Sequence, residues 1–227
     1  MSKATSKVKT VYLAILNQGW IRAELVLLLT KWIRESPYNL YLRLPAKKPI
    51  MNNRNDIVKD FLSKDFDYLM MLDCDIIPPS DFLTLVDYDK DIIGGLCFCC
   101  KNQKGRDVII PLALDKKPTG KKDVKWKYRP VKLEGCEGLV EVDAVGTGAI
   151  IIARRVLEHP KMKPAFVDYY DKEGLRIEGL DLSFCRRAKE LGFKVYTHTS
   201  FPCSHWTEMD LMQIYTDEIL KETKVGE

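Results

Sequence analysis

The fold is decided by residues 68–77, which read YLMMLDCDII. Residues 68–72 form an unbroken apolar run, which is typical of a central strand buried on both faces. The polar triplet Asp73-Cys74-Asp75 follows directly. Because ligands of open α/β sheets bind at the carboxyl ends of the strands, this triplet is the first candidate for a functional site.

Strand and helix signals alternate around this segment through the first half of the chain. Further strands are expected at three places: 8–16, 39–44 and 91–96. A first helix is indicated by apolar residues at helical spacing: Ile21, Leu25, Leu28, Leu29 and Trp32. A second helix is expected to be capped by Asn52 and Asn53, and a short third one to start at Pro78. This alternation predicts an α/β fold with a mostly parallel central sheet flanked by helices.

The second half of the chain carries different signals. Residues 100–130 are polar and basic and are expected to form a long loop with short strands. Residues 139–152 predict a strand that Gly146-Thr147-Gly148 interrupts. Two further helices are expected at 182–191 and 208–223, and one further strand is expected at 193–196.

The composition is that of a water-soluble globular protein. Of the 227 residues, 46% are hydrophobic and 30% are charged, which argues against disorder. No run of 18 apolar residues occurs, so no transmembrane helix is expected. The apolar run 11–16 follows three lysines, but no small-residue cleavage site comes after it, so we interpret it as a strand and not as a signal peptide. The seven cysteines are an odd, irregular set, which favours reduced thiols and a cytoplasmic protein.

Positive charge is concentrated in residues 116–132, which hold eight basic residues and one acidic residue. The net charge of the whole chain is +4, so the rest of the chain is mildly acidic. A basic loop of this kind favours an anionic partner, such as phosphate, an anionic membrane surface or nucleic acid. A loop that is merely solvated stays open as the alternative.

A further acidic candidate lies at the start of the helix expected near residue 181. Asp181 shares a helical face with the apolar residues Phe184, Cys185 and Ala188, so it is predicted to face inward. The helix dipole favours an ionised carboxylate at this end of a helix. Such a carboxylate suits a base that accepts a proton from a hydroxyl group. The alternative is that Asp181 only caps the helix.

These motifs, in this order, resemble the GT-A fold glycosyltransferases, and in particular the broad family-2-like group. The resemblance rests on a helix opened by Asn53-Arg54-Asn55, on four further stretches and on the late His205, and it extends from about residue 8 to 206. The stretches are DYLMMLDCDIIPPSDFLTL, DIIGGL, VDAVGTGAIIIARRVLE and LDLSFCRRAKELGFKVY. The resemblance implies a single Rossmann-like GT-A domain over 1–227. Its nucleotide-binding half is 8–100, and its acceptor-side half, 101–227, has a smaller mixed sheet, the basic loop 116–132 and the C-terminal helix.

In such enzymes a DxD motif holds a divalent cation that binds the diphosphate of a nucleotide-sugar donor. The resemblance therefore implies that Asp75 is a direct ligand of Mn²⁺ or Mg²⁺. It implies that Asp73 contacts either the ribose or, through water, the metal, and that Cys74 lies at the cofactor between them. His205 is implied as an additional metal ligand.

The same resemblance places Asn17 and Arg54 beside the nucleotide and Gly148 beside the sugar and the acceptor. It makes Asp181 the base of an inverting transfer of the sugar to an acceptor hydroxyl. The group usually carries Glu-Asp at this point, whereas Leu180 precedes Asp181 here. If Asp181 is not the base, a retaining transfer stays open.

Two other functions are compatible with parts of this pattern. A phosphatase of the haloacid dehalogenase type also places DxD after an apolar strand, but that strand usually comes early in the chain. A non-catalytic module could bind nucleotide or nucleic acid through the basic loop 116–132, although no nucleic-acid recognition motif supports nucleic acid as the partner. The expected acceptor is a sugar, a lipid-linked molecule or a protein, and the expectation extends to peripheral contact with an anionic membrane.

Overall fold

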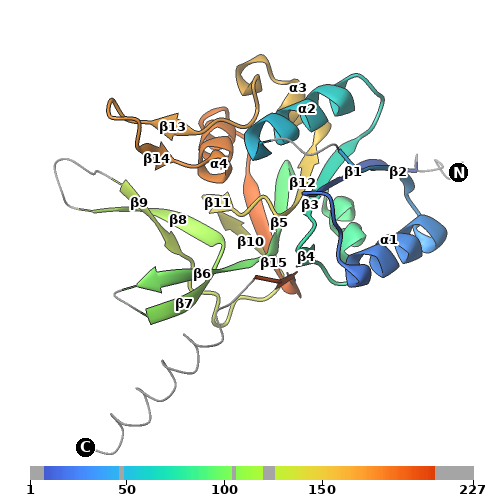
Figure 1. Cartoon of the computed structure of the whole chain (residues 1–227), viewed down its shortest axis with the longest axis horizontal. Helices are drawn as coiled ribbons and strands as arrows, with labels where there is room; N and C mark the ends of the chain where they lie inside the picture. The colour runs from blue at the N-terminus through green and yellow to red at the C-terminus, as the bar shows by residue number, and fades with distance from the viewer. Residues whose placement is uncertain (1–7, 46–48, 104–105, 120–125, 208–227) are drawn as a thin grey trace, which may run out of the picture.

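A central sheet of seven strands organises the computed structural model, which describes residues 8–45, 49–103, 106–119 and 126–207 (Figure 1). The strands follow the order β10-β15-β5-β12-β3-β1-β2 across the sheet. Their bounds are Leu139–Val142, Val195–Pro202, Ile92–Leu96, Ala149–Ala153, Tyr68–Asp73, Thr10–Leu16 and Asn39–Arg43, in that order.

This sheet is mixed. Strands β2, β1 and β3 are parallel to one another, and β5 is parallel to β15. Strand β12 comes from the second half of the chain and lies antiparallel between β3 and β5. Parallel pairing is therefore confined to those two groups of strands. The predicted α/β fold, with a central sheet flanked by helices, is confirmed. The sheet has three parallel and three antiparallel pairings, whereas a mostly parallel sheet was predicted, because β12 enters between β3 and β5.

Helices cover both faces of the sheet. On one face, α1 (Ala23–Glu35) buries Leu25, Leu29 and Trp32 against the strands. The other face is covered by α2 (Ile50–Leu62) and α4 (Leu180–Glu190). Three short helices pack into the same layers: η1 (Phe82–Tyr88) on the side of α1, and α3 (Arg154–Glu158) and η2 (Pro160–Met162) on the side of α2 and α4.

The start of α2 differs from the prediction. Pro49 is the N-cap, and the backbone N–H of Asn53 already donates to the Pro49 carbonyl at 2.9 Å. Asn52 and Asn53 therefore lie inside the first turn, so the predicted asparagine cap is wrong. Proline supports this earlier start because its ring fixes φ near the helical value and the helix needs no N–H donor there.

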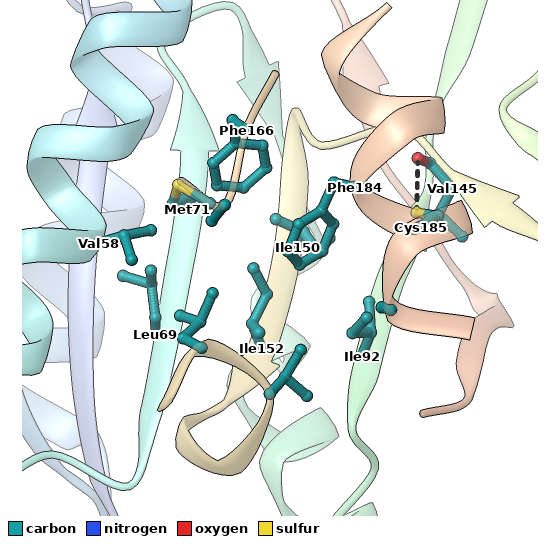
Figure 2. Packing of buried hydrophobic residues seen from close by; sticks show 14 of the residues in the cluster. Val58, Leu69, Met71, Ile92, Val145, Ile150, Ile152, Phe166, Phe184 and Cys185 are labelled. Carbon is teal, nitrogen blue, oxygen red and sulfur yellow. Dashed lines mark hydrogen bonds between the residues drawn. The ribbon is translucent and has the colours of Figure 1, made fainter. Parts of the chain in front are cut away.

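Strand β3 carries the core on both of its faces, as its unbroken apolar run predicts. Leu69 and Met71 point into one layer, while Met70 and Leu72 point into the other, and all four are fully buried. Figure 2 shows the first layer, in which Met71 lies near Phe166. The rings of Phe166 and Phe184 stack there with centroids 4.7 Å apart. Burial of each such side chain stabilises the folded state by about 1.5–3 kcal/mol. Strand β3 is therefore held firmly in the sheet.

Residues 100–130 contain more strand than we predicted. They form the hairpin of β6 (Phe98–Gln103) and β7 (Arg106–Pro111), and the hairpin of β8 (Ala113–Pro118) and β9 (Trp126–Pro130). The smaller sheet is β11-β8-β9, with β11 at Ala144–Val145. Both of its pairings are antiparallel, so the mixed arrangement predicted for this sheet is wrong. Lys121, Lys122 and Lys125 of the basic stretch, and the helix predicted at 208–223, lie outside the described residues.

Three hairpins project from the body on the side away from α1 and β2 (Figure 1). They are β6–β7, β8–β9 and the hairpin of β13 (Tyr169–Tyr170) with β14 (Arg176–Glu178). In the part of the chain that the structure describes, no helix has the length and apolar character needed to cross a membrane.

His198 on β15 is a buried titratable group. Its Nε2 lies 2.9 Å from the hydroxyl of Tyr88, and its Nδ1 accepts a hydrogen bond from the backbone N–H of Ser200 at 3.2 Å. The ring is therefore neutral with the proton on Nε2. Burial lowers the pKa of His198 below its ordinary value of 6.5.

We expect this group to make the free energy of unfolding depend on pH. The unfolded chain takes up a proton near pH 6.5, whereas the folded chain does so only at lower pH. The stabilisation of the fold by neutral His198 is therefore complete above pH 6.5 and is lost as the pH falls toward the pKa of His198 in the folded chain. Over this range the free energy of unfolding changes by up to about 1.4 kcal/mol per pH unit.

Urea unfolding of the wild type and of His198→Gln at pH 7.5 and pH 5.5 measures this effect. The stability difference between the two proteins should shrink at the lower pH, since the carboxylates contribute equally to both. A difference that is constant with pH would contradict the assignment.

Candidate active site

The Asp73-Cys74-Asp75 triplet lies where β3 ends, as predicted. Asp73 is the last residue of the strand, and its backbone N–H donates to the carbonyl of Gly148 at 2.8 Å. The N–H of Cys74 donates to the carbonyl of Leu16, at the end of β1, at 2.9 Å. Short strand β4 (Ile76–Ile77) follows at once. Three chain segments thus fix the position of the triplet.

Arg54 on α2 forms an ion pair with Asp73 in which one nitrogen contacts both carboxylate oxygens. Its Nη2 lies 3.0 Å and 3.1 Å from the two carboxylate oxygens, and its Nη1 donates to the carbonyl of Thr147 at 2.9 Å. The Arg54 side chain is only 3% exposed. The resemblance places Arg54 beside the nucleotide; in the structure the guanidinium faces Asp73 and the Thr147 backbone. The side chain of Asp73 is 30% exposed and keeps one edge open.

Asp73 is electrostatically strained in spite of this partner. Burial raises the pKa of its carboxyl, the charge of Arg54 opposes that effect, and the negative charges of Asp181 and Asp75 add to it. A cation placed near these three carboxylates would relieve their mutual repulsion.

Asp181 lies in the first turn of α4 and is connected to the same network. The hydroxyl of Thr147 donates a hydrogen bond to its Oδ1. Thr147 is fully buried, and its carbonyl accepts from Arg54. The two acidic positions found from the sequence, Asp73 and Asp181, are therefore joined through Arg54 and Thr147.

Gly148 is required for the close approach of Asp73. A Cβ atom on this residue would lie 3.1 Å from Oδ2 of Asp73 and 3.2 Å from Ile76. A larger side chain would crowd the carboxylate, so the glycine lets the turn before β12 approach the end of β3 closely.

His205 lies beside Asp75 because two short strands pair. Strand β16 (Ser204–His205) runs antiparallel to β4 with His205 opposite Ile76, and the N–H of Trp206 donates to the Asp75 carbonyl at 3.0 Å. The imidazole Nε2 lies 3.6 Å from Oδ2 of Asp75. Nδ1 lies 2.6 Å from the carbonyl of Phe98. A carbonyl only accepts, so Nδ1 carries the proton and Nε2 presents its lone pair toward Asp75 in the neutral ring.

This arrangement fits a hard divalent cation. Metal-bound histidines usually donate their second N–H to a carbonyl or carboxylate, as His205 does to Phe98. Within the described residues no three His, Cys, Asp or Glu side chains converge as a complete ligand set. Mg²⁺ in particular is often held by one or two carboxylates together with substrate phosphates, so Asp75 and His205, with Asp73 behind them, suit a cation shared with a ligand.

Two cavities flank the network. The first, of about 680 Å³, opens at the triplet. Its lining residues are Leu16, Asn17, Gln18, Pro49, Ile50, Asn53, Asp73, Cys74 and Asp75. The second, of about 430 Å³, opens at Asp181. Its lining residues are Ile50, Arg54, Leu112, Leu114, Val145, Gly146, Arg176, Gly179, Leu180, Asp181 and Leu182.

The two asparagines of the first cavity have different environments. The side chain of Asn17 shapes the loop after β1: its Nδ2 donates to the Ile15 carbonyl at 3.2 Å, and its Oδ1 accepts from the N–H of Gly19 at 3.1 Å. Asn53 is 3% exposed, and its Oδ1 has no hydrogen-bond partner among the described residues. Sequence reasoning missed Asn53 and the hydroxyl of Thr147, because neither residue type signals a site where it stands in the sequence.

The comparisons with known proteins bear on the fold. No family model matches the chain, and no curated protein matches it. Among solved structures the chain is similar to A197 from STIV, with a TM-score of 0.56 and 21% identity over 88% of this chain and 87% of that chain. It is also similar to GalNAc-T7 with UDP, GalNAc and Mn²⁺, with a TM-score of 0.52 and 12% identity over 90% of this chain and 45% of that chain. The likeness shows a shared fold and confirms the predicted GT-A-like architecture.

The Arg54–Asp73 pair yields a prediction about stability. Arg54→Gln leaves the carboxylate of Asp73 without its cation, so the free energy of unfolding should fall by about 3 kcal/mol. Urea denaturation measures the loss. Arg34→Gln, on the exposed side of α1, is the matched control and should stay within about 0.5 kcal/mol of the wild type.

The double variant Arg54→Gln/Asp73→Asn removes both charges and should recover part of the loss, because no uncompensated carboxylate remains. If Arg54→Gln behaves like the control, the pair does not hold the end of β3.

Proposed function

We propose that this chain is a metal-dependent glycosyltransferase that moves a sugar from a nucleoside diphosphate to an acceptor hydroxyl. The observation that carries the proposal is the connected chain Asp73–Arg54–Thr147–Asp181, which runs from the cavity at the triplet to the cavity at Asp181. Such a reaction needs one site that holds a diphosphate and, next to it, one site that holds a base and an acceptor.

The first cavity is the proposed donor site. Asp75, with His205 beside it, would hold Mn²⁺ or Mg²⁺, and Asp73 would contact the ribose or, through water, the metal. When bound, the cation neutralises the charge on the leaving nucleoside diphosphate. The similarity to a protein whose structure contains UDP, GalNAc and Mn²⁺ supports a donor of this class. Arg54 acts as a positioning residue for Asp73.

Asp181 is the proposed base. The hydroxyl of Thr147 occupies its Oδ1, so Oδ2 stays available to an acceptor hydroxyl in the second cavity. As the acceptor oxygen bonds to the anomeric carbon, its proton passes to Asp181. The bond between the anomeric carbon and the diphosphate oxygen breaks, and the nucleoside diphosphate leaves. This single displacement inverts the configuration at the anomeric carbon.

Nucleotide binding is the first test. In calorimetric titrations with UDP, GDP, CDP and dTDP, each with and without Mn²⁺, we expect one nucleotide to bind only in the presence of the metal. Asp75→Asn and His205→Gln should abolish the metal-dependent part, because they remove the protein's ligands. Asp65→Asn, an exposed carboxylate after α2, is the control and should bind as the wild type does. If none of the four nucleotides binds, the proposal fails.

Turnover of the matching nucleotide sugar tests the base. Asp181→Asn should lower kcat by about 10²–10⁴-fold, while the affinity for the nucleotide with Mn²⁺ stays at the wild-type value. Glu190→Gln, at the exposed end of the same helix, should leave both quantities unchanged. If Asp181→Asn turns over at the wild-type rate, Asp181 is not the base. A chain that binds nucleotide but shows no turnover of its sugars with any acceptor would instead be a non-catalytic binding module.

A further inference from the structure

Large apolar side chains are exposed on the hairpins that project from the body. Leu175 and Ile177 of the β13–β14 hairpin are 64% and 67% exposed, and Tyr170 on its other strand is 57% exposed. Ile109 on β7 is 71% exposed. Single exposed apolar residues need no explanation, but several of them on one side of a molecule mark an interaction surface.

The apolar residues of β13–β14 lie together. Leu175 and Ile177 are two positions apart in an extended stretch of chain, so their side chains project to the same side. The charges around them cancel, because Lys172 and Arg176 stand against Asp171 and Glu173. This hairpin therefore offers apolar contact without a charge of its own.

The β8–β9 hairpin carries positive charge. Its two described strands hold four basic residues and one acidic residue: Lys116, Lys117, Lys127, Arg129 and Asp115. The side chain of Lys117 lies 3.1 Å from Asp115, which leaves the charge of the other strand uncompensated by this carboxylate. Lys127 and Arg129 on that strand are exposed.

The two hairpins are neighbours on one side of the molecule. Leu114 on β8 and Arg176 on β14 line the same cavity, the one at Asp181. Both hairpins project on the side away from α1, together with β6–β7 (Figure 1). Apolar side chains and positive charge are therefore presented on the same side, next to the second cavity.

This combination suits an anionic lipid bilayer better than a soluble polyanion. Binding of a polyanion such as nucleic acid rests mainly on charge, so it gives Leu175 and Ile177 no role. A bilayer surface uses both features, since its anionic headgroups attract lysine and arginine and its acyl boundary buries apolar side chains. Tyr170 fits as well, because tyrosine is favoured at the boundary between headgroups and acyl chains.

Helix α1, on the other side of the molecule, provides a comparison. It also exposes apolar residues, with Leu27 at 71% and Ile33 at 57%. Its charges are balanced, however, with Glu24 and Glu35 against Lys31 and Arg34. The apolar residues of α1 therefore lack the surrounding positive charge that attracts an anionic bilayer.

We infer that the β8–β9 and β13–β14 hairpins form a docking surface for an anionic lipid bilayer. Lys127 and Arg129 contact the headgroups, while Leu175 and Ile177 enter the acyl boundary. The cavity at Asp181, which both hairpins border, then lies close to the bilayer. This inference goes beyond the proposed function and does not require it.

Co-sedimentation of the full chain with phosphatidylcholine vesicles, with and without phosphatidylglycerol, tests the inference. We expect binding to the vesicles that contain phosphatidylglycerol, and binding about tenfold or more weaker to phosphatidylcholine alone. Added salt should weaken the binding, because it screens the headgroup charge. If the chain does not bind the anionic vesicles, or binds both kinds equally, the inference is wrong.

Apolar substitutions locate the surface. Leu175→Ser/Ile177→Ser should weaken binding to the anionic vesicles at least about tenfold. Leu27→Ser/Ile33→Ser on α1 is the matched control, since it changes the same residue types at similar exposed fractions, and it should bind as the wild type does. Thermal unfolding confirms that each variant is folded. Loss of binding in the α1 variant, with none in the hairpin variant, overturns the inference.

Charge substitutions complete the test. Lys127→Gln/Arg129→Gln should also weaken the binding about tenfold or more and make it less dependent on salt, whereas Lys31→Gln/Arg34→Gln on α1 should not. If only the charge variant of the hairpins loses binding, the surface recognises polyanions in general, and a bilayer is not its specific partner.

Titration of the same proteins with the nucleotide and Mn²⁺, without vesicles, separates the two proposals. Vesicle binding without nucleotide binding refutes the glycosyltransferase and keeps the docking surface. Nucleotide binding without vesicle binding has the opposite meaning.

Discussion

The structure of the site depends on one buried ion pair, that between Arg54 and Asp73. Arg54 is 3% exposed, and a charge so far from water is tolerated only when it is paired and hydrogen-bonded. Its remaining bond, to the Thr147 carbonyl, ties α2 to the turn before β12. The pair therefore joins β3, α2 and that turn at one point. The positions of Gly148 and of the Thr147 hydroxyl, and through it of Asp181, follow from this contact.

Much of this arrangement could be predicted from the sequence. The parts that could not be predicted have one physical cause in common. The apolar run of β3 revealed a strand buried on both faces, and it located the carboxylates at the carboxyl end of that strand. Periodicity does not show which way a side chain turns, so the inward direction of Arg54 and the bond from Thr147 to Asp181 emerged only in three dimensions. The direction of β12 also depends on partners distant in the sequence. In β8 and β9 basic residues hide the alternation that marks a strand.

Two cavities flank this geometry. One opens where the parallel strands β1 and β3 end, and the other opens between β8 and α4. The network of Asp73, Arg54, Thr147 and Asp181 lies between them and keeps the acidic groups of each side at a fixed separation.

The place of β12 in the sheet has a consequence for how the chain matures. Residues 8–100 supply β1, β2, β3 and β5, yet β3 and β5 meet only through β12, which is made about 50 residues later. A nascent chain that ends before residue 149 leaves both strands with open hydrogen-bonding edges, which are templates for aggregation. Residues 8–100 therefore cannot fold as an independent piece during synthesis. Contacts between segments this distant also slow folding, so the unfinished chain needs protection until β12 and β15 have emerged.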